Sequence, residues 1–189
     1  MEAPDGTQIL TCADVEGWQS WLADHHAVSS GVWLLIAKKG SGEVSVTISD
    51  ALDVALCYGW IDSQRKGYDA DHYLQRYTPR RPKSPWSRLN VDRVEALIAA
   101  GRMRAPGLTE VAAAKADGRW AAAYEPQRGA NVPADLAAAL DASVRARTAF
   151  ERLDKTGRYG VILPVLKATT PAMRTARVKK AIAKLEAST

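Results

Sequence analysis

The residues best suited to chemistry are concentrated in one stretch, residues 59–90, which reads GWIDSQRKGYDADHYLQRYTPRRPKSPWSRLN. It contains two of the six Trp, three of the six Tyr and seven Lys or Arg, against three Asp. Guanidinium groups bind carboxylates and phosphates through paired hydrogen bonds, and aromatic rings stack on planar or cationic groups. Because this mixture packs poorly as a core, it predicts a site that binds an anionic or planar ligand.

Asp62 is the candidate catalytic residue of this stretch. It follows Trp60 and Ile61 at the start of an expected strand. A carboxyl in partly apolar surroundings takes a raised pKa and can act as a general acid or base. The alternative is a structural salt bridge to Arg76 or Arg80, since ion-pair networks mark the same kind of place.

The loop after the expected hairpin supplies the anion-binding candidates. Pro79 and Pro82 break regular structure and stiffen it. We expect Ser84 to cap a helix that begins at Pro85, whose free backbone N–H groups form a second anion site. The alternatives are a solvated basic loop, ordinary packing of aromatic rings, and a surface position for the helix residue Asn90. The ligand-binding candidates are Trp60, Tyr73, Arg76, Arg80, Arg81, Lys83, Ser84, Trp86, Ser87 and Asn90.

Two expected strands must position these side chains, residues 60–66 and 71–78, joined by a turn at 67–70. Side chains alternate along a strand, so Trp60, Asp62 and Gln64 share one face of the first strand. Tyr73, Gln75 and Tyr77 share one face of the second. If the register brings these faces together, Asp62 lies among Tyr and Gln side chains.

The remaining pattern predicts an α+β fold with a small, mainly antiparallel sheet. Residues 8–12 and 31–37 read as strands, and residues 43–48, with alternating Val44, Val46 and Ile48, read as a half-buried strand or an extended lead, which we place in the sheet. A capping-box pattern from Thr11 to Asp14 opens a helix that runs to about His26, and a second helix, capped by Thr47 or Ser49, covers residues 50–58 and ends at Gly59. Further helices are expected at 85–100, 106–118, 134–140, 143–153 and 171–187, with a kinked apolar segment at 159–168. We divide the chain into an α+β core, residues 1–104, and a helical part, residues 105–189.

Several classes of protein are disfavoured by composition. Two Cys make no disulfide framework, and no His or Cys spacing fits a zinc site. No phosphate-binding or nucleophile-elbow motif occurs, so we expect no cofactor. The start of the chain lacks signal-peptide features and no apolar run approaches the ~20 residues of a membrane span, so we expect a cytoplasmic protein. Its oligomeric state is not indicated.

The motifs GWID at 59–62 and PR-x-PKS-x-WS-x-x-N at 79–90 resemble the YdeI/OmpD-associated family, also called bacteriocin-protection proteins. The resemblance includes Leu97-Ile98 and Gly101-Arg102-Met103, and continues to residues 171–174. There the sequence reads Pro-Ala-Met-Arg where the family tends to carry Pro-Glu-Thr-Arg. The resemblance to this family implies a role in resistance to bacteriocins or cationic antimicrobial peptides.

We therefore expect a stress-resistance protein that binds a small anionic or aromatic ligand in a basic, aromatic-lined pocket. The net charge of +5 and the basic last helix leave sequence-tolerant nucleic-acid binding as a second hypothesis. An enzyme that uses Asp62 as general acid or base is the third, and the residues do not decide between binding and catalysis.

Overall fold

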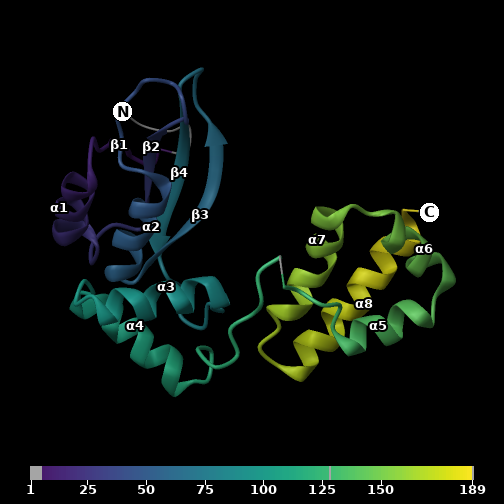
Figure 1. The fold of residues 1–189 in the computed structure, drawn as a ribbon. Helices are drawn as coiled ribbons and strands as arrows, with labels where there is room; N and C mark the ends of the chain where they lie inside the picture. The colour runs from purple at the N-terminus through teal and green to yellow at the C-terminus, as the bar shows by residue number, and fades with distance from the viewer. Residues whose placement is uncertain (1–5, 128, 189) are drawn as a thin grey trace. The chain divides into compact units, whose positions relative to one another are not determined.

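The computed structural model describes residues 6–127 and 129–188. The chain forms two compact units. The first contains the residues up to Ser84 together with Asp92–Gly118, and the second contains Pro85–Val91 together with the chain from Arg119 onward. Each unit has its own helices and its own buried side chains, and each is described by itself (Figure 1).

A four-stranded sheet forms the centre of the first unit. Its strands are β1 (Ile9–Thr11), β2 (Val32–Ala37), β3 (Trp60–Gly67) and β4 (His72–Pro79). They lie in the order β1-β2-β4-β3, with β1 parallel to β2 and the other two pairs antiparallel. The α+β class is thus confirmed, whereas the sheet is mixed.

The expected strand at 43–48 is wrong. Residues 43–47 have no strand structure, and Ile48 already begins a helix. The edge of β2 that this segment would need is taken by β1, so Val46 donates only a single backbone bond, to Cys12 (3.0 Å). Thr47, which is itself still extended, caps this helix by accepting from the N–H of Asp50 (3.1 Å), and it is one of the two predicted caps.

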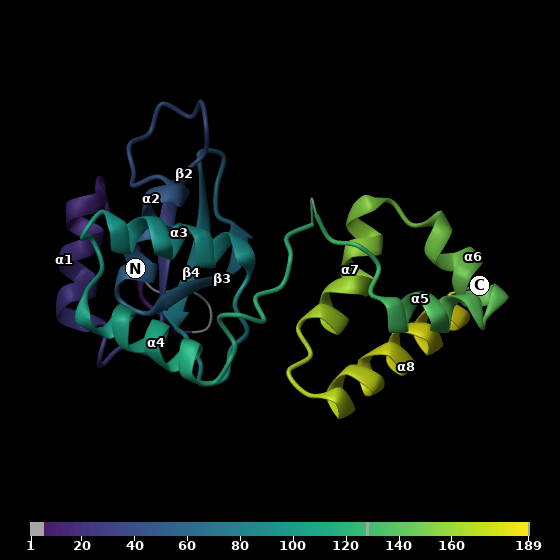
Figure 2. The same ribbon diagram turned by 60° about the horizontal axis from the view of Figure 1, so that its bottom comes forward.

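Two helices cover one face of the sheet, α1 (Val15–His25) and α2 (Ile48–Cys57) (Figures 1 and 2). The buried Trp18 of α1 fastens them together, because its indole N–H donates to the carbonyl of Ala51 in α2 (3.0 Å). The same ring lies 5.4 Å from the ring of Tyr77 in β4. The opposite face carries a smaller cluster around Trp33, and the Lys66 ammonium lies 4.8 Å from that ring.

Two further helices extend the first unit, α3 (Arg88–Ala99), whose first turn falls in the second unit, and α4 (Ala105–Ala116). The sequence placed α4 in the helical part, whereas the structure groups it with the sheet. Gly59 follows the end of α2 and has a positive φ of +74°, as expected for the residue that ends this helix. Its carbonyl accepts from the N–H of Arg80 (3.0 Å).

The predicted cap of α3 is corrected from Ser84 to Ser87. Residues 86–88 are held extended, because the carbonyl of Trp86 accepts from Tyr124 (3.0 Å) and the N–H of Arg88 donates back to it (2.9 Å). The helix therefore begins only at Arg88, and the hydroxyl of Ser87 accepts from the N–H of Asn90 (3.2 Å). The N–H donors expected to bind an anion, near residues 84–87, therefore lie before the helix, and that of Ser84 donates to the carbonyl of Arg81 (3.0 Å).

Four helices build most of the second unit, α5 (Ala134–Asp141), α6 (Val144–Arg152), α7 (Lys155–Leu166) and α8 (Pro171–Ala187). Their core includes Leu136, Phe150, Val165 and Leu185. Thr170 caps α8 as predicted, and Pro164 lies within α7. In the part of the chain that the structure describes, no helix has the length and apolar character that crossing a membrane requires.

The contact between α2 and α4 gives a test of the first unit. A Cβ added at Gly107 would overlap the carbonyl oxygen of Cys57, which is backbone and cannot swing away. We expect Gly107→Ala to lower the free energy of unfolding by about 1–3 kcal/mol or more, measured by urea denaturation. Gly67→Ala is the control, since its Cβ would meet nothing within 4 Å, and a change within about 0.5 kcal/mol is expected. Equal effects of the two substitutions would contradict this packing.

Candidate functional site

The β3–β4 hairpin brings the predicted polar faces together. Asp62 pairs directly with Tyr77, so the two side chains leave the sheet on the same face. Trp60 shares this face two residues earlier, and Tyr73 and Gln75 share it on β4. The expectation that Asp62 lies among Tyr and Gln side chains is thereby confirmed.

A β-bulge follows Asp62 and changes which residue comes next on this face. The register shifts between Asp62 and Arg65, so Arg65, and not Gln64, lies opposite Gln75. The buried Gln75 amide holds the bulge in place. Its nitrogen donates to the carbonyl of Gln64 (3.0 Å), and its oxygen accepts from Nε of Arg65 (3.1 Å). The Arg65 guanidinium then lies 4.7 Å from the ring centre of Tyr73.

The Asp62 carboxyl is the electrostatically unusual group of the site. The residue is exposed, but the surrounding protein partly desolvates the carboxyl group, and this desolvation raises the pKa of Asp62. A backbone hydrogen bond and the positive charges of Arg65, Arg80 and Arg93 act in the opposite direction but do not cancel the rise. No ion pair within 4 Å joins Asp62 to any described residue.

Tyr77, across the hairpin from Asp62, has no exposed surface. Burial raises the pKa of its hydroxyl, and the charge of Asp62 raises it further. Within residues 6–127 and 129–188 this hydroxyl has no hydrogen-bond partner. A buried hydroxyl without a partner costs about 1–3 kcal/mol, so its presence in a native protein requires an explanation, and a functional role is one.

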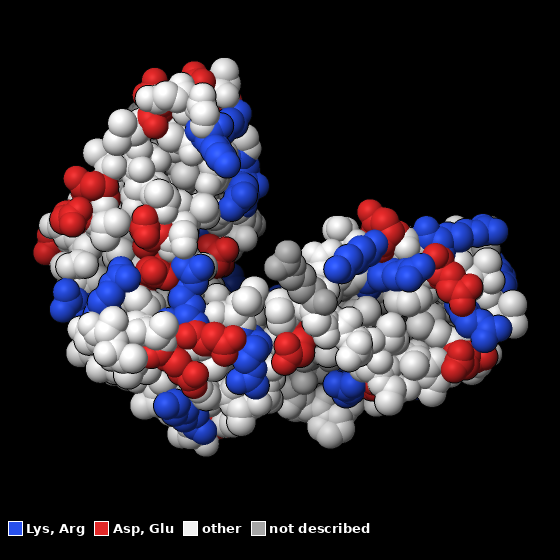
Figure 3. Space-filling view, viewed as in Figure 1, with Lys and Arg blue, Asp and Glu red and all other residues white. Residues whose placement is uncertain are grey.

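Three arginines surround the pair from different elements. Arg80 is buried at the end of β4, with Nε 3.8 Å from the carboxylate of Glu110. Arg93 of α3 donates to Asp53 (2.6 Å) and to the carbonyl of Ser49 (3.1 Å). Arg93 could not be predicted from the sequence, because its partner Asp53 is 40 residues away and no local pattern connects the two. Basic side chains gather along the β3 edge of the first unit (Figure 3).

The other sequence candidates lie elsewhere. Trp60 is in the core, where its N–H donates to the carbonyl of His26 (3.2 Å). Arg76 leaves the opposite face of the sheet, 5.6 Å from the ring centre of Trp33. Arg81 and Lys83 are exposed on the loop, and Lys83 adopts a left-handed conformation, φ 63°.

Ser84 closes a turn by donating its N–H to the carbonyl of Arg81 (3.0 Å). The remaining candidates, Trp86, Ser87 and Asn90, belong to the second unit. There the buried Trp86 ring lies 4.9 Å from that of Trp120. The structure thus brings Asp62, Tyr73 and Arg80 together with residues that were not chosen as candidates, Arg65, Gln75, Tyr77 and Arg93.

Metal and thiol chemistry have little support in the described part of the chain. No group of three or more His, Cys, Asp or Glu is placed to hold a metal ion there. Both cysteines are buried and free. Burial and the nearby Asp14 raise the pKa of Cys12 to about 11, so its thiol is protonated and unreactive at neutral pH.

These features define an α+β protein whose hairpin carries one carboxyl and one buried phenol, with arginines nearby from the hairpin, from the residue after it and from α3. A family model described as a domain of unknown function (DUF8412) matches residues 10–110, just over half of the 189 residues, and the chain belongs to this family. A second model, described as "Bacteriocin-protection, YdeI or OmpD-Associated", matches residues 130–188.

The resemblance to the bacteriocin-protection family is therefore confirmed, but in the helices of the second unit. The hairpin motifs that suggested it lie within the residues matched by the other model. No curated protein and no solved structure matches the chain.

The two interpretations of Asp62 predict opposite shifts, because a stabilising salt bridge lowers the pKa of a carboxyl whereas desolvation raises it. A carboxyl whose pKa is higher in the folded than in the unfolded protein destabilises the fold once it is ionised. Wild type should therefore lose stability as the pH rises from the unfolded pKa of Asp62 through its folded pKa. We expect Asp62→Asn to have a higher Tm than wild type at pH 7, and the gain to vanish near pH 3.

The control is Asp71→Asn, an exposed position at the turn of the same hairpin, which should track wild type. A lower Tm for Asp62→Asn at pH 7 would instead show that Asp62 forms a stabilising ion pair, and would remove it from the site.

Proposed function

We propose that this protein binds a small anionic or aromatic ligand at the β3–β4 hairpin, and that this binding serves protection against bacteriocins or antimicrobial peptides. The observation that carries the proposal is the pairing of a poorly solvated carboxyl, Asp62, with a buried Tyr77 hydroxyl that has no partner among the described residues. Perturbed carboxyls and unsatisfied polar groups together are typical of functional sites.

The neighbouring side chains suit a planar ligand with an acidic group. The Arg65 guanidinium keeps donors beyond the one that Gln75 uses, and these can bind a carboxylate. Tyr73 is half-buried beside it and offers an aromatic face. The Asp62 carboxyl can accept from, or when protonated donate to, a polar group on the ligand. Arg81 and Lys83 of the loop add positive charge that attracts an anion to this region.

The protective role is supported by the match of residues 130–188 to the bacteriocin-protection model. In a cell that lacks the gene, expression of the wild-type chain is expected to raise survival under a cationic antimicrobial peptide, and the Arg65→Gln/Tyr73→Leu variant is expected to do so less. Equal protection by a variant that has lost ligand binding would separate the protective role from the hairpin.

A catalytic role is favoured by one observation, the raised pKa of Asp62. Such a carboxyl can transfer a proton closer to neutral pH than an ordinary aspartate. The two functions differ in what happens to a bound compound. Mass spectrometry after prolonged incubation would find it unchanged for a binding protein, and converted by wild type but not by Asp62→Asn for an enzyme.

A thermal-shift screen tests ligand binding directly. Its probes are substituted benzoates, the matching neutral benzamides, and inorganic phosphate. A ligand present at 100 times its Kd adds about 2.7 kcal/mol of stability, which corresponds to a rise in Tm of about 5–10 °C for a protein of this size. We expect the largest shifts from benzoates, because only they combine a planar ring with a carboxylate for Arg65.

Arg65→Gln and Tyr73→Leu should each reduce the shift by more than half. Arg147→Gln in the second unit is the control, since it removes an exposed arginine that pairs only with Asp141 (3.5 Å) among the described residues, and it should leave the shift intact. A benzoate shift that survives both hairpin substitutions would place the ligand elsewhere and refute the proposed site.

A further inference from the structure

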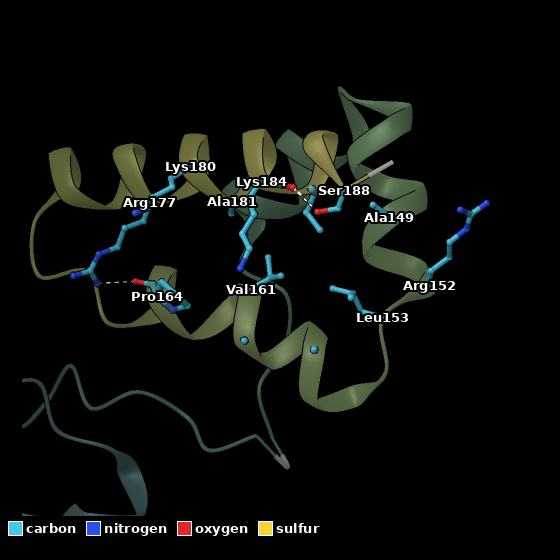
Figure 4. A pocket seen from close by; sticks show the side chains of 13 residues that line it. Ala149, Arg152, Leu153, Val161, Pro164, Arg177, Lys180, Ala181, Lys184 and Ser188 are labelled. Carbon is cyan, nitrogen blue, oxygen red and sulfur yellow. Dashed lines mark hydrogen bonds between the residues drawn. The ribbon is translucent and has the colours of Figure 1, made fainter. Parts of the chain in front are cut away.

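A cavity of about 780 Å³ lies between α6, α7 and α8 in the second unit (Figure 4). Its size falls within the range of about 300–1,000 Å³ typical of small-molecule sites. Every residue that lines it comes from these three helices or from the residues directly after α6 and α8. It is therefore a feature of the second unit alone, and it shares no residue with the hairpin.

Small residues leave this space open. Ala149, Gly157, Gly160 and Ala181 line the cavity and have little or no side chain to fill it. A Cβ added at Gly160 would meet nothing within 4 Å. Pro164, one turn later, has no N–H to donate to the carbonyl of Gly160, so that carbonyl lacks its usual helical partner.

The charge of the lining has one sign. Four of the lining residues are Lys or Arg, and none is Asp or Glu. The Lys184 side chain reaches from α8 toward Val161 of α7, across the cavity, whereas Arg152 points away (Figure 4). Arg177 donates to the carbonyl of Pro164 (2.6 Å), near the C-terminal end of α7, and so ties the two helices together at this end.

The rest of the lining is aliphatic. Leu153, Val161 and Leu185 form an apolar wall, and they also pack in the core of the second unit. None of the described residues that line the cavity is aromatic, so none of them can stack on a base or another planar ligand. An apolar wall with cationic side chains from α8 beside it complements an aliphatic chain that ends in an anionic group.

We propose that this cavity binds a linear anionic amphiphile, with a medium-chain fatty acid as its ligand class. The alkyl chain would lie against Leu153, Val161 and Leu185, and the carboxylate would pair with Lys184 and Lys180. A cationic peptide is disfavoured by like-charge repulsion, and a nucleotide by the absence of any aromatic lining. The inference does not rest on the function proposed for the hairpin.

Isothermal titration of the whole chain with octanoate, decanoate and dodecanoate, below their micelle concentrations, tests the apolar wall. Each methylene that enters the cavity should lower Kd by about fourfold until the wall is covered. Dodecanol tests the charge, because it keeps the chain and lacks the carboxylate, and it should bind about tenfold more weakly than dodecanoate. Affinity that is independent of chain length would overturn the proposal.

Two variants and a control locate the ligand. Lys180→Gln/Lys184→Gln should weaken dodecanoate binding by about three- to tenfold, whereas Lys179→Gln, on the same helix but outside the lining, should not. Gly160→Phe should abolish binding by filling the cavity, with helix content unchanged by circular dichroism because its Cβ is unobstructed.

Other occupants of the cavity give different results. If anionic vesicles bind wild type and all three lysine substitutions weaken that binding equally, the basic helix meets a membrane surface and not a single ligand. Sedimentation that shows a dimer of wild type but a monomer of Gly160→Phe, without fatty-acid binding, would assign the cavity to a second copy of this chain. Either result overturns the proposal.

Discussion

The pairing of Asp62 with Tyr77 across β3 and β4 is the constraint on which the site depends. The core fixes the position of Tyr77, because this residue is wholly buried and its ring packs against that of Trp18. The β-bulge fixes the register of β3, because the Gln75 amide donates to the carbonyl of Gln64. A slip of one residue would move Asp62 to the opposite face of the sheet, so the position of its carboxyl opposite Tyr77 is built into the fold.

The placement of Asp62 and Tyr77 lowers the stability of the fold, which is an argument that these residues serve a function. A desolvated carboxyl and an unsatisfied phenol both destabilise a folded protein, and sequences that serve stability alone tend to lose such groups. Nearby, Arg80 and Arg93 approach carboxylates of their own, Glu110 and Asp53, so neither forms a close ion pair with Asp62. The first unit thus combines a partly desolvated carboxyl with a buried hydroxyl that has no partner among the described residues, beside basic side chains along the β3 edge, and this combination is the reason for proposing a ligand site there.

The second unit differs from the first in that its cavity is lined by aliphatic and basic side chains. Its helices have their own core, and the small residues of the lining leave space for the cavity between α6, α7 and α8. No aromatic or acidic residue of the described chain lines it. The two units also match two different family models. The two binding regions that we propose, one polar and aromatic and one aliphatic and basic, fall in different units, so their roles can be tested separately by mutation.

Much of the local structure could be predicted because its causes are local. The hairpin, its alternating faces, the caps at Thr47 and Thr170 and the α+β class all follow from short patterns, and the structure confirms them. What failed depends on distant partners. Residues 43–47 alternate like a strand, but β1 occupies the neighbouring edge of β2. Ser84 precedes a proline like a helix cap, but Tyr124 holds residues 86–88 extended. Arg65 enters the site only through the bulge, and Arg93 only through tertiary packing, so neither could be chosen from spacing.

Titration of the Asp62 carboxyl by ¹³C NMR tests the central claim most directly. The ordinary pKa of an aspartate is about 3.9. Poor solvation opposite Tyr77 predicts a pKa above that value in wild type, and predicts that it stays raised in Tyr77→Phe, because burial and not the phenol is its main cause. A pKa at or below the ordinary value would show that the arginines dominate, and that Asp62 is a salt-bridge partner and not the centre of a site.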